Sequence, residues 1–225
     1  QYTLSNSSQS IDVWDITTPV NPFRVPVSQQ GNSITFNSDA SSLREFIAFN
    51  GNTFLTAEFV EEVPNQNLHG QRNIDYLIIA YPEFIAEAEQ LADFHRSQGD
   101  MQIFVTTIDK VYNEFSSGGQ DITAIRDFAK MLYDDSESGK ELKYLLLFGD
   151  ASYDYKDILP DNTNYVPCWE SVKSLDIVSS IASDDYFGFL DDGEGVESSN
   201  DLVDIGIGRF VVANNIEAQV AVDKT

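Results

Sequence analysis

Two short apolar runs constrain the fold of this chain more than any other feature. Tyr76–Tyr81 ends at Pro82, and Tyr144–Phe148 ends at Gly149-Asp150. Each run is far shorter than the roughly 20 residues of a membrane-spanning helix. Each has the length and composition of a strand that is buried on both faces, as in the parallel sheets of α/β proteins. The runs therefore predict an α/β domain and no membrane-spanning segment.

Helical patterns separate the predicted strands. Apolar residues recur at helical spacing from Ile85 to His95 and stop at Gly99. Asp121 is placed to cap a second helix with an apolar stripe from Ile122 to Leu132. Strands are also predicted at Met101–Ile108, at Leu142–Phe148, which contains the second apolar run, at Ile181–Leu190 and at Leu202–Val211. Asn214 or Asn215 is placed to cap a last helix. This alternation predicts a parallel sheet with helices on both faces.

The first 70 residues follow a different pattern. Short β-forming runs are separated by Asn, Pro and Gly: Ile11–Ile16, Phe23–Val27, Ser33–Phe36, Leu43–Phe49 and Phe54–Val63. Close spacing without a helical period predicts an antiparallel β-rich segment. We therefore assign residues 1–70 to a β-rich segment and linker, and residues 71–225 to the α/β domain. Because the last predicted helix is still running at Thr225, we expect this domain to be truncated at its C-terminal end.

Charge and cysteine content exclude several classes of protein. The net charge of −24 argues strongly against binding to nucleic acid, because phosphates attract Lys and Arg and repel carboxylates. The 42% of hydrophobic residues is too many for a disordered acidic chain. A single cysteine excludes an internal disulfide framework and a cysteine-rich zinc site. The chain is therefore predicted to be a folded acidic protein.

Carboxylates gather in the two loops after the predicted third strand. Asp150 and Asp154 follow that strand directly, and Asp184 and Asp185 lie in the next segment. Because the carboxyl ends of parallel strands meet at one edge of a sheet, converging loops would form an oxygen-rich pocket that suits calcium. The alternative is that these acids cap helices, close turns or face water. We favour a structural or ligating role for Asp150 and a solvated role for the other three.

The residues needed for nucleophilic catalysis do not form a recognisable motif. Cys168 is flanked by Pro167 and Trp169, without the helix N-terminus that would lower its pKa. His69 lies in the predicted linker and His95 on a helix, so neither is placed as its base. The motif Gly206-Ile207-Gly208-Arg209 is a weak dinucleotide fingerprint. Within a strand, such glycines indicate close approach of another backbone, and Arg209 is expected to pair with neighbouring carboxylates.

Seven sequence blocks, taken in order, resemble the gingipain-type cysteine peptidases, most closely the members that act as C-terminal signal peptidases (sortases) of type IX secretion. The blocks are Asn65–Gly70, Asp75–Ala80, Tyr112–Gly118, Ala124–Lys130, Leu145–Asp154, Ser183–Gly188 and Asp204–Arg209. The resemblance implies a caspase-like catalytic region of two sheet-bearing halves, of which this chain is the first. The catalytic His and Cys of the family lie in the second half, so the resemblance assigns no catalytic residue here.

The resemblance also implies cofactors, partners and a location. Gingipains bind calcium and sodium, so Asp150, Asp184 and Asp185 become candidate ligands of a structural calcium ion, and no organic cofactor is expected. The implied partners are the C-terminal half of the catalytic region, secreted cargo proteins and type IX secretion components, at the bacterial cell surface or outer membrane. The full-length protein would cleave C-terminal signals from cargo through a cysteine thioester, and this piece alone is expected to be inactive.

Two other functional classes fit parts of the sequence. The first is a non-enzymatic, cation-stabilised interaction module built from the β-rich segment and the α/β domain. The second is a response-regulator-like receiver, suggested by acids at strand ends. The receiver ranks last because the sequence does not supply a lysine and paired acids in the required loops.

Overall fold

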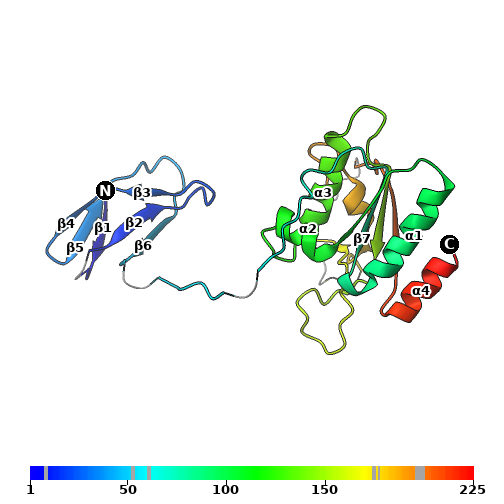
Figure 1. Cartoon of the computed structure of the whole chain (residues 1–225). Coiled ribbons are helices and arrows are strands. Elements are labelled where there is room, and N and C mark those ends of the chain that lie inside the picture. Colours follow the sequence, from blue (N-terminus) through cyan, green and yellow to red (C-terminus); the bar gives the residue numbers. More distant parts are fainter. Residues whose placement is uncertain (8–9, 52–53, 60–61, 174–175, 177, 196–200) are drawn as a thin grey trace. The chain divides into compact units, whose positions relative to one another are not determined.

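The chain folds into two compact units, Gln1–Val63 and Pro64–Thr225 (Figure 1). The structure, a computed structural model, describes all residues except 8–9, 52–53, 60–61, 174–175, 177 and 196–200. The division falls after Val63, whereas we placed the boundary between the two parts after residue 70. This difference arises because Gln66, Leu68 and His69 all hydrogen bond to Glu114 of the second unit.

The first unit consists of two three-stranded antiparallel sheets. Their strands are β1 (Tyr2–Ser5), β2 (Asp12–Asp15), β3 (Phe23–Val25), β4 (Val27–Gln30), β5 (Ser33–Phe36) and β6 (Phe46–Phe49). The sheets have the orders β1-β5-β4 and β3-β2-β6. Val13 and Val25 from one sheet form a core cluster with Phe36 from the other. The predicted antiparallel β-rich segment is therefore confirmed, but β1 and β4 are additional strands, because the run predicted at Phe23–Val27 breaks at Pro26.

The strand predicted at Phe54–Val63 is wrong for the residues that the structure describes. Residues 54–59 and 62–63 form no strand, residues 60–61 lie outside the described part, and Leu55 is 99% exposed. The run has β-forming residues, but strand preference depends on packing against neighbouring strands. In the described part of the unit, β6 pairs only with β2, and the chain leaves that sheet after Phe49.

The second unit contains a four-stranded parallel sheet in the order β12-β9-β7-β8. The strands are β7 (Tyr76–Ala80), β8 (Ile103–Thr107), β9 (Tyr144–Phe148) and β12 (Gly206–Phe210). Ile78 of β7 lies opposite Val105 on one side and Leu146 on the other. Leu77 to Ala80 are completely buried, as expected of a strand covered on both faces. The predicted parallel sheet is therefore confirmed.

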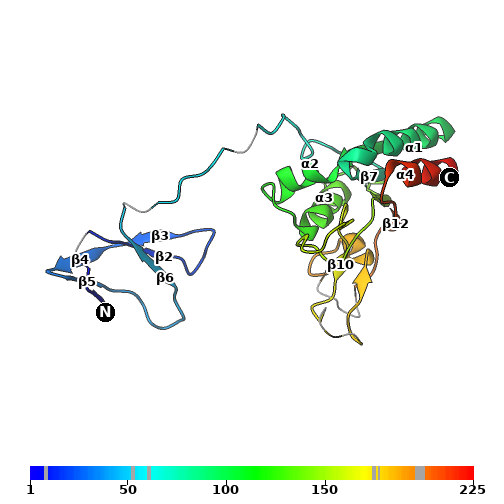
Figure 2. The same cartoon turned by 90° about the horizontal axis from the view of Figure 1, so that it is seen from below.

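Helices cover both faces of this sheet (Figure 2). The 3₁₀ helix η1 (Pro82–Phe84) leads into α1 (Ile85–Gln98), which shares one face with α4 (Asn215–Asp223). The other face carries α2 (Ile108–Phe115) and α3 (Ile122–Asp134). The side chain of Asp121 caps α3 by accepting from Thr123 N–H, as predicted. Of the two candidates for the cap of α4, the structure selects Asn214, which accepts from Glu217 N–H.

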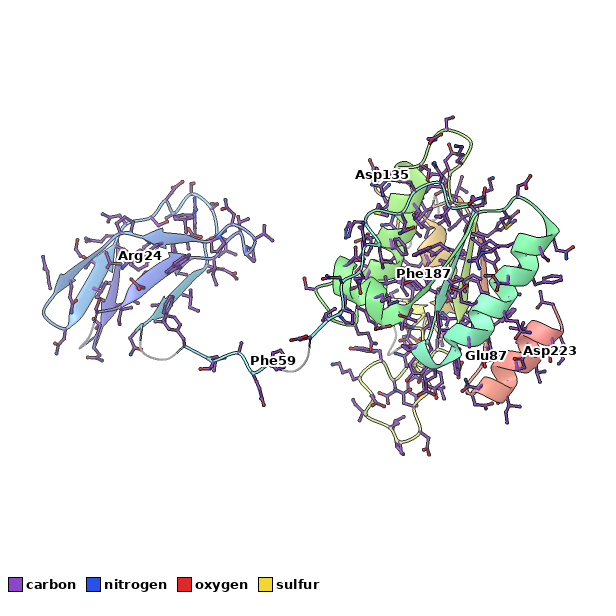
Figure 3. All side chains as sticks on the ribbon, viewed as in Figure 1. Arg24, Phe59, Glu87, Asp135, Phe187 and Asp223 are labelled. Carbon is purple, nitrogen blue, oxygen red and sulfur yellow. The ribbon has the colours of Figure 1, made fainter. Side chains whose placement is uncertain are left out.

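The segment between β9 and β12 differs from the prediction. Ile181–Leu190 is not one long strand: it contains the short strand β11 (Ala182–Ser183), paired with β10 (Trp169–Glu170), and the 3₁₀ helix η2 (Asp185–Gly188). Phe187 in η2 is completely buried within the unit (Figure 3). Burial of this side chain against α3 favours a compact turn over an extended strand. Among the described residues, no helix is long and apolar enough to cross a membrane.

Candidate functional site

The carboxyl edge of the parallel sheet is the place where ligands bind in α/β proteins, at the point where the strand order reverses. Here β7 lies between β8 and β9, so the reversal falls where β7 and β9 end. Gly149, directly after β9, has a φ of 153° and donates its N–H to Phe210 O at 3.0 Å. Asp150 N–H donates to Val212 O at 3.0 Å. The loop that follows β9 is thereby anchored to the end of β12.

Arg209 is the central side chain of this edge. Its Nε donates to Asp184 Oδ2 at 2.8 Å and its Nη2 to Asp184 Oδ1 at 2.7 Å. The same guanidinium donates to the carbonyl oxygens of Gly149, Val166 and Pro167 at 2.9, 2.6 and 3.2 Å. Only 9% of the Arg209 side chain is exposed. This bidentate pair, predicted in outline from the sequence, joins β12, the end of β9 and the segment before η2.

The three predicted calcium ligands are in different environments. Asp150 accepts from Thr163 Oγ1 at 2.6 Å and from Ala151 N–H at 2.9 Å, so its carboxylate closes the loop after β9. Both oxygens of Asp184 accept from Arg209. Asp185 is exposed at the start of η2. Within the described residues no three His, Cys, Asp or Glu side chains gather as a metal site.

Cys168 lies beside this edge, on the wall of a cavity of about 330 Å³. Asp121 and Ile122 at the start of α3 line the same cavity, together with Glu170. Burial raises the pKa of the Cys168 thiol above its usual value, and the charges of Asp184 and Glu170 raise it further, whereas Arg209 opposes the shift. The thiol form is therefore favoured, and a thiol is a poor nucleophile.

His69 belongs to a different cluster, centred on Glu114 of α2. Its Nδ1 lies 2.7 Å from Glu114 Oε2, and its ring stacks on Phe115 with centroids 4.3 Å apart. Glu114 also accepts from the N–H groups of Leu68 and His69, at 2.6 and 2.9 Å, and from Gln66 Nε2 at 3.0 Å. Burial by itself would raise the pKa of Glu114, but these hydrogen bonds outweigh it and lower the pKa to about 2.

His95 lies apart from both clusters, in the last turn of α1. Its ring packs against those of Tyr76 and Phe94, with centroids 5.7 and 5.5 Å away. The chain contains two histidines and one cysteine. None of the hydrogen bonds, ring contacts or ion pairs in the described residues joins either histidine to Cys168. The geometry therefore supplies no cysteine–histidine dyad within the described part of this chain.

Two contacts made by charged side chains of this unit were not predicted from the sequence. Glu114 joins the Tyr112–Gly118 block to the Asn65–Gly70 block. Arg126 in α3 donates to Phe189 O at 2.7 Å and lies over the ring of Tyr186, which joins α3 to η2. Each of these charged residues lies in a sequence block that resembles the family, and this position was the only indication of a role. No local pattern identifies a partner about 46 or 63 residues away.

The comparisons with known proteins agree with this architecture. The family model of peptidase family C25 matches residues 69–225. No curated protein matches the chain. A solved structure, dimeric latent PorU from Porphyromonas gingivalis, is similar to it with a TM-score of 0.84 and 31% identity, over 99% of this chain. This chain spans only 22% of that one. Because the family model covers most of the chain, the chain belongs to peptidase family C25, the gingipain family.

Proposed function

We propose that this chain is the first half of the catalytic region of a cysteine peptidase, and that it supports the half that carries the nucleophile and base. The observation that carries the proposal is the separation of Cys168, His69 and His95 within a C25 fold. A cysteine peptidase needs a thiolate within hydrogen-bond reach of its base. The supporting role suits the carboxyl edge, where Arg209 holds several segments in one position.

The similarity to PorU supports a more specific role in the same proposal. The full-length protein would cleave the C-terminal signals of secreted cargo and form a thioester acyl-enzyme. An amine would then attack the thioester, take the acyl group and release the enzyme thiol, as in a sortase. Its partners would be the C-terminal half of the catalytic region, cargo proteins and type IX secretion components. Its location would be the bacterial cell surface or outer membrane. The likeness that supports this role covers 99% of the chain at 31% identity.

Peptidase assays on two proteins test the proposal. The 225-residue chain should release no product from a peptide that carries a C-terminal signal, with or without reducing agent. The full-length protein should retain its activity after Cys168→Ser and lose it when a cysteine beyond Thr225 is replaced by alanine. Activity that disappears on Cys168→Ser would refute the supporting role. If the full-length protein contains no cysteine and histidine that could catalyse cleavage, the result would favour the alternative hypothesis of a non-enzymatic interaction module.

Calcium binding at Asp150, Asp184 and Asp185 is a separate proposal with its own test. A calcium ion that binds Asp184 would compete with Arg209 for both carboxylate oxygens. The melting temperature of the chain should rise in millimolar calcium relative to chelator at matched ionic strength, because a ligand that binds only the folded state stabilises it. Equal melting temperatures in the two solutions would refute the proposal.

A further inference from the structure

The loop that follows β9 is held in one conformation by a buried carboxylate. Asp154 is only 8% exposed. Its side chain accepts from Leu159 N–H at 2.7 Å, and its main-chain oxygen accepts from Asn162 Nδ2 at 2.7 Å. Asp157 and Asp161 have φ values of 53° and 59°, in the left-handed region that costs energy for residues other than glycine. The hydrogen bonds of Asp154 therefore fix a loop that is strained at two positions.

This loop turns apolar side chains towards solvent. Tyr153, Tyr155, Ile158 and Leu159 are between 47% and 74% exposed, and Figure 1 shows the loop projecting from the second unit. Exposed apolar side chains that are grouped on one surface mark interaction sites. Tyrosine is also enriched among the residues that dominate binding energy. Because the loop is already ordered, a partner that covers these side chains would lose less conformational entropy on binding.

The same loop borders the cavity of about 330 Å³ at the carboxyl edge. Ser152 and Tyr155 line the cavity from the loop, and Ile122 and Pro167 add apolar wall. Gln120 Nε2 donates to Tyr155 O at 3.2 Å, which joins the loop to the start of α3. Because Tyr155 belongs both to the cavity and to the exposed apolar group, the two form one continuous surface.

The charge of the cavity favours a cationic partner. Asp121 and Glu170 line it, and no Lys, Arg or His is among its described lining residues. Asp121 uses its Oδ1 to cap α3. None of the hydrogen bonds and ion pairs of the described residues involves the Glu170 carboxylate, which acts on Cys168 only through its charge. A basic side chain would lay its apolar stem along Ile122 and bring its charge to Glu170. The net charge of −24 would attract such a partner.

We propose that this surface binds an extended segment of a protein substrate, with a basic side chain in the cavity and apolar side chains on the loop. Successive side chains of an extended segment point to opposite sides, so one row can meet the cavity and the other the loop. An anionic membrane does not fit, because Asp157 and Asp161 lie in the same loop. The inference rests on the proposed function for the identity of the partner, but the binding itself requires no catalytic residue.

Fluorescence anisotropy with labelled, end-blocked peptides tests this binding. The proteins are the 225-residue chain and the full-length protein, with any cysteine beyond Thr225 replaced by alanine to prevent cleavage. A peptide in which lysine and leucine alternate should bind to both proteins. Replacing its lysines by glutamate, or its leucines by serine, should weaken binding at least about tenfold, because the first change removes the charge pair and the second removes the apolar contact.

Two variants of the protein locate the binding. Glu170→Gln should weaken binding of the lysine–leucine peptide at least about tenfold, because a hydrogen bond between charged groups is lost. Ile158→Ser should weaken it about tenfold through the lost apolar contact. The matched controls in the same unit are Asp100→Asn, before β8 at the amino end of the sheet, and Ile216→Ser, which is 79% exposed at the start of α4. Both controls should leave the affinity unchanged.

Equal binding of the lysine and glutamate peptides, or equal effects of a variant and its control, would overturn the inference. Binding to the 225-residue chain but not to the full-length protein would also overturn it, because the rest of the protein would then cover the surface. Sedimentation with phospholipid vesicles, or a dimer that Ile158→Ser abolishes, would assign another occupant. Peptide binding by a full-length protein without peptidase activity would support this surface and count only against the proposed function. Peptidase activity without peptide binding would refute the inference alone.

Discussion

Replacement of Arg209 by methionine should destabilise the second unit more than any single surface change. Methionine keeps an apolar stem of similar shape but removes every hydrogen bond of the guanidinium. Asp184 would then lose its partner, and the carbonyl groups of Gly149 and Val166 would lose their donor. Breaking a buried ion pair by removing one member costs about 3–5 kcal/mol. Because 25% of the Asp184 side chain is exposed, water compensates in part, and we expect about 3 kcal/mol.

Urea unfolding monitored by tryptophan fluorescence measures this loss. The chain contains two tryptophans. Trp169 belongs to the second unit and stacks on Tyr186, with ring centroids 6.0 Å apart, so a Trp14→Phe background reports that unit alone. For a domain of this size, about 3 kcal/mol corresponds to a melting temperature lower by about 6–12 °C. Arg209→Lys should also lose most of the stability that Arg209 contributes, because one ammonium group does not reproduce the bidentate geometry.

Lys140→Met is the matched control in the same unit. Lys140 pairs with Glu137, but their side chains are 55% and 68% exposed, so its loss should be within about 0.5 kcal/mol. Asp184→Asn should cost about 1–2 kcal/mol in chelator, because the amide still accepts one hydrogen bond from Arg209. A loss below about 1 kcal/mol for Arg209→Met would refute the reasoning that this pair holds the carboxyl edge together.

Two further changes test the rest of the second unit. The folded pKa of Glu114, about 2, lies below its usual value of 4.5, so its charge stabilises the fold above pH 4.5 and this contribution disappears as the pH falls towards 2. The stability difference between wild type and Glu114→Gln in urea unfolding should therefore shrink from pH 6 to pH 3, and a constant difference would contradict it. Gly149→Ala should lower stability by about 1–3 kcal/mol, because the φ of 153° is strained for alanine and the new Cβ would lie 3.1 Å from Val166 Cγ2. Gly99→Ala, in the same unit, should have no comparable effect in the same unfolding assay, because a Cβ there meets nothing within 4 Å.

Local pattern was sufficient to predict most of the second unit. The runs that became β7 and β9, the stripe of α1 and the cap of α3 are each encoded within about 15 consecutive residues. Patterns of this kind report which face of an element is buried, and that decides the fold class. The order of family-like blocks likewise identified the family. Helix α2 was missed because it has only 8 residues and follows β8 without a break.

The fold class, the main strands and helices and the family could be predicted from the amino-acid sequence, because periodicity and capping act between neighbours in the chain. Which charged groups meet could be seen only in the folded protein. Asp184 was a candidate calcium ligand by position, yet its oxygens accept from Arg209, 25 residues away. Ile181–Leu190 has the composition of a strand, yet burial of Phe187 folds it into a 3₁₀ turn. Such contacts depend on how separate elements pack against one another, and no local pattern records that.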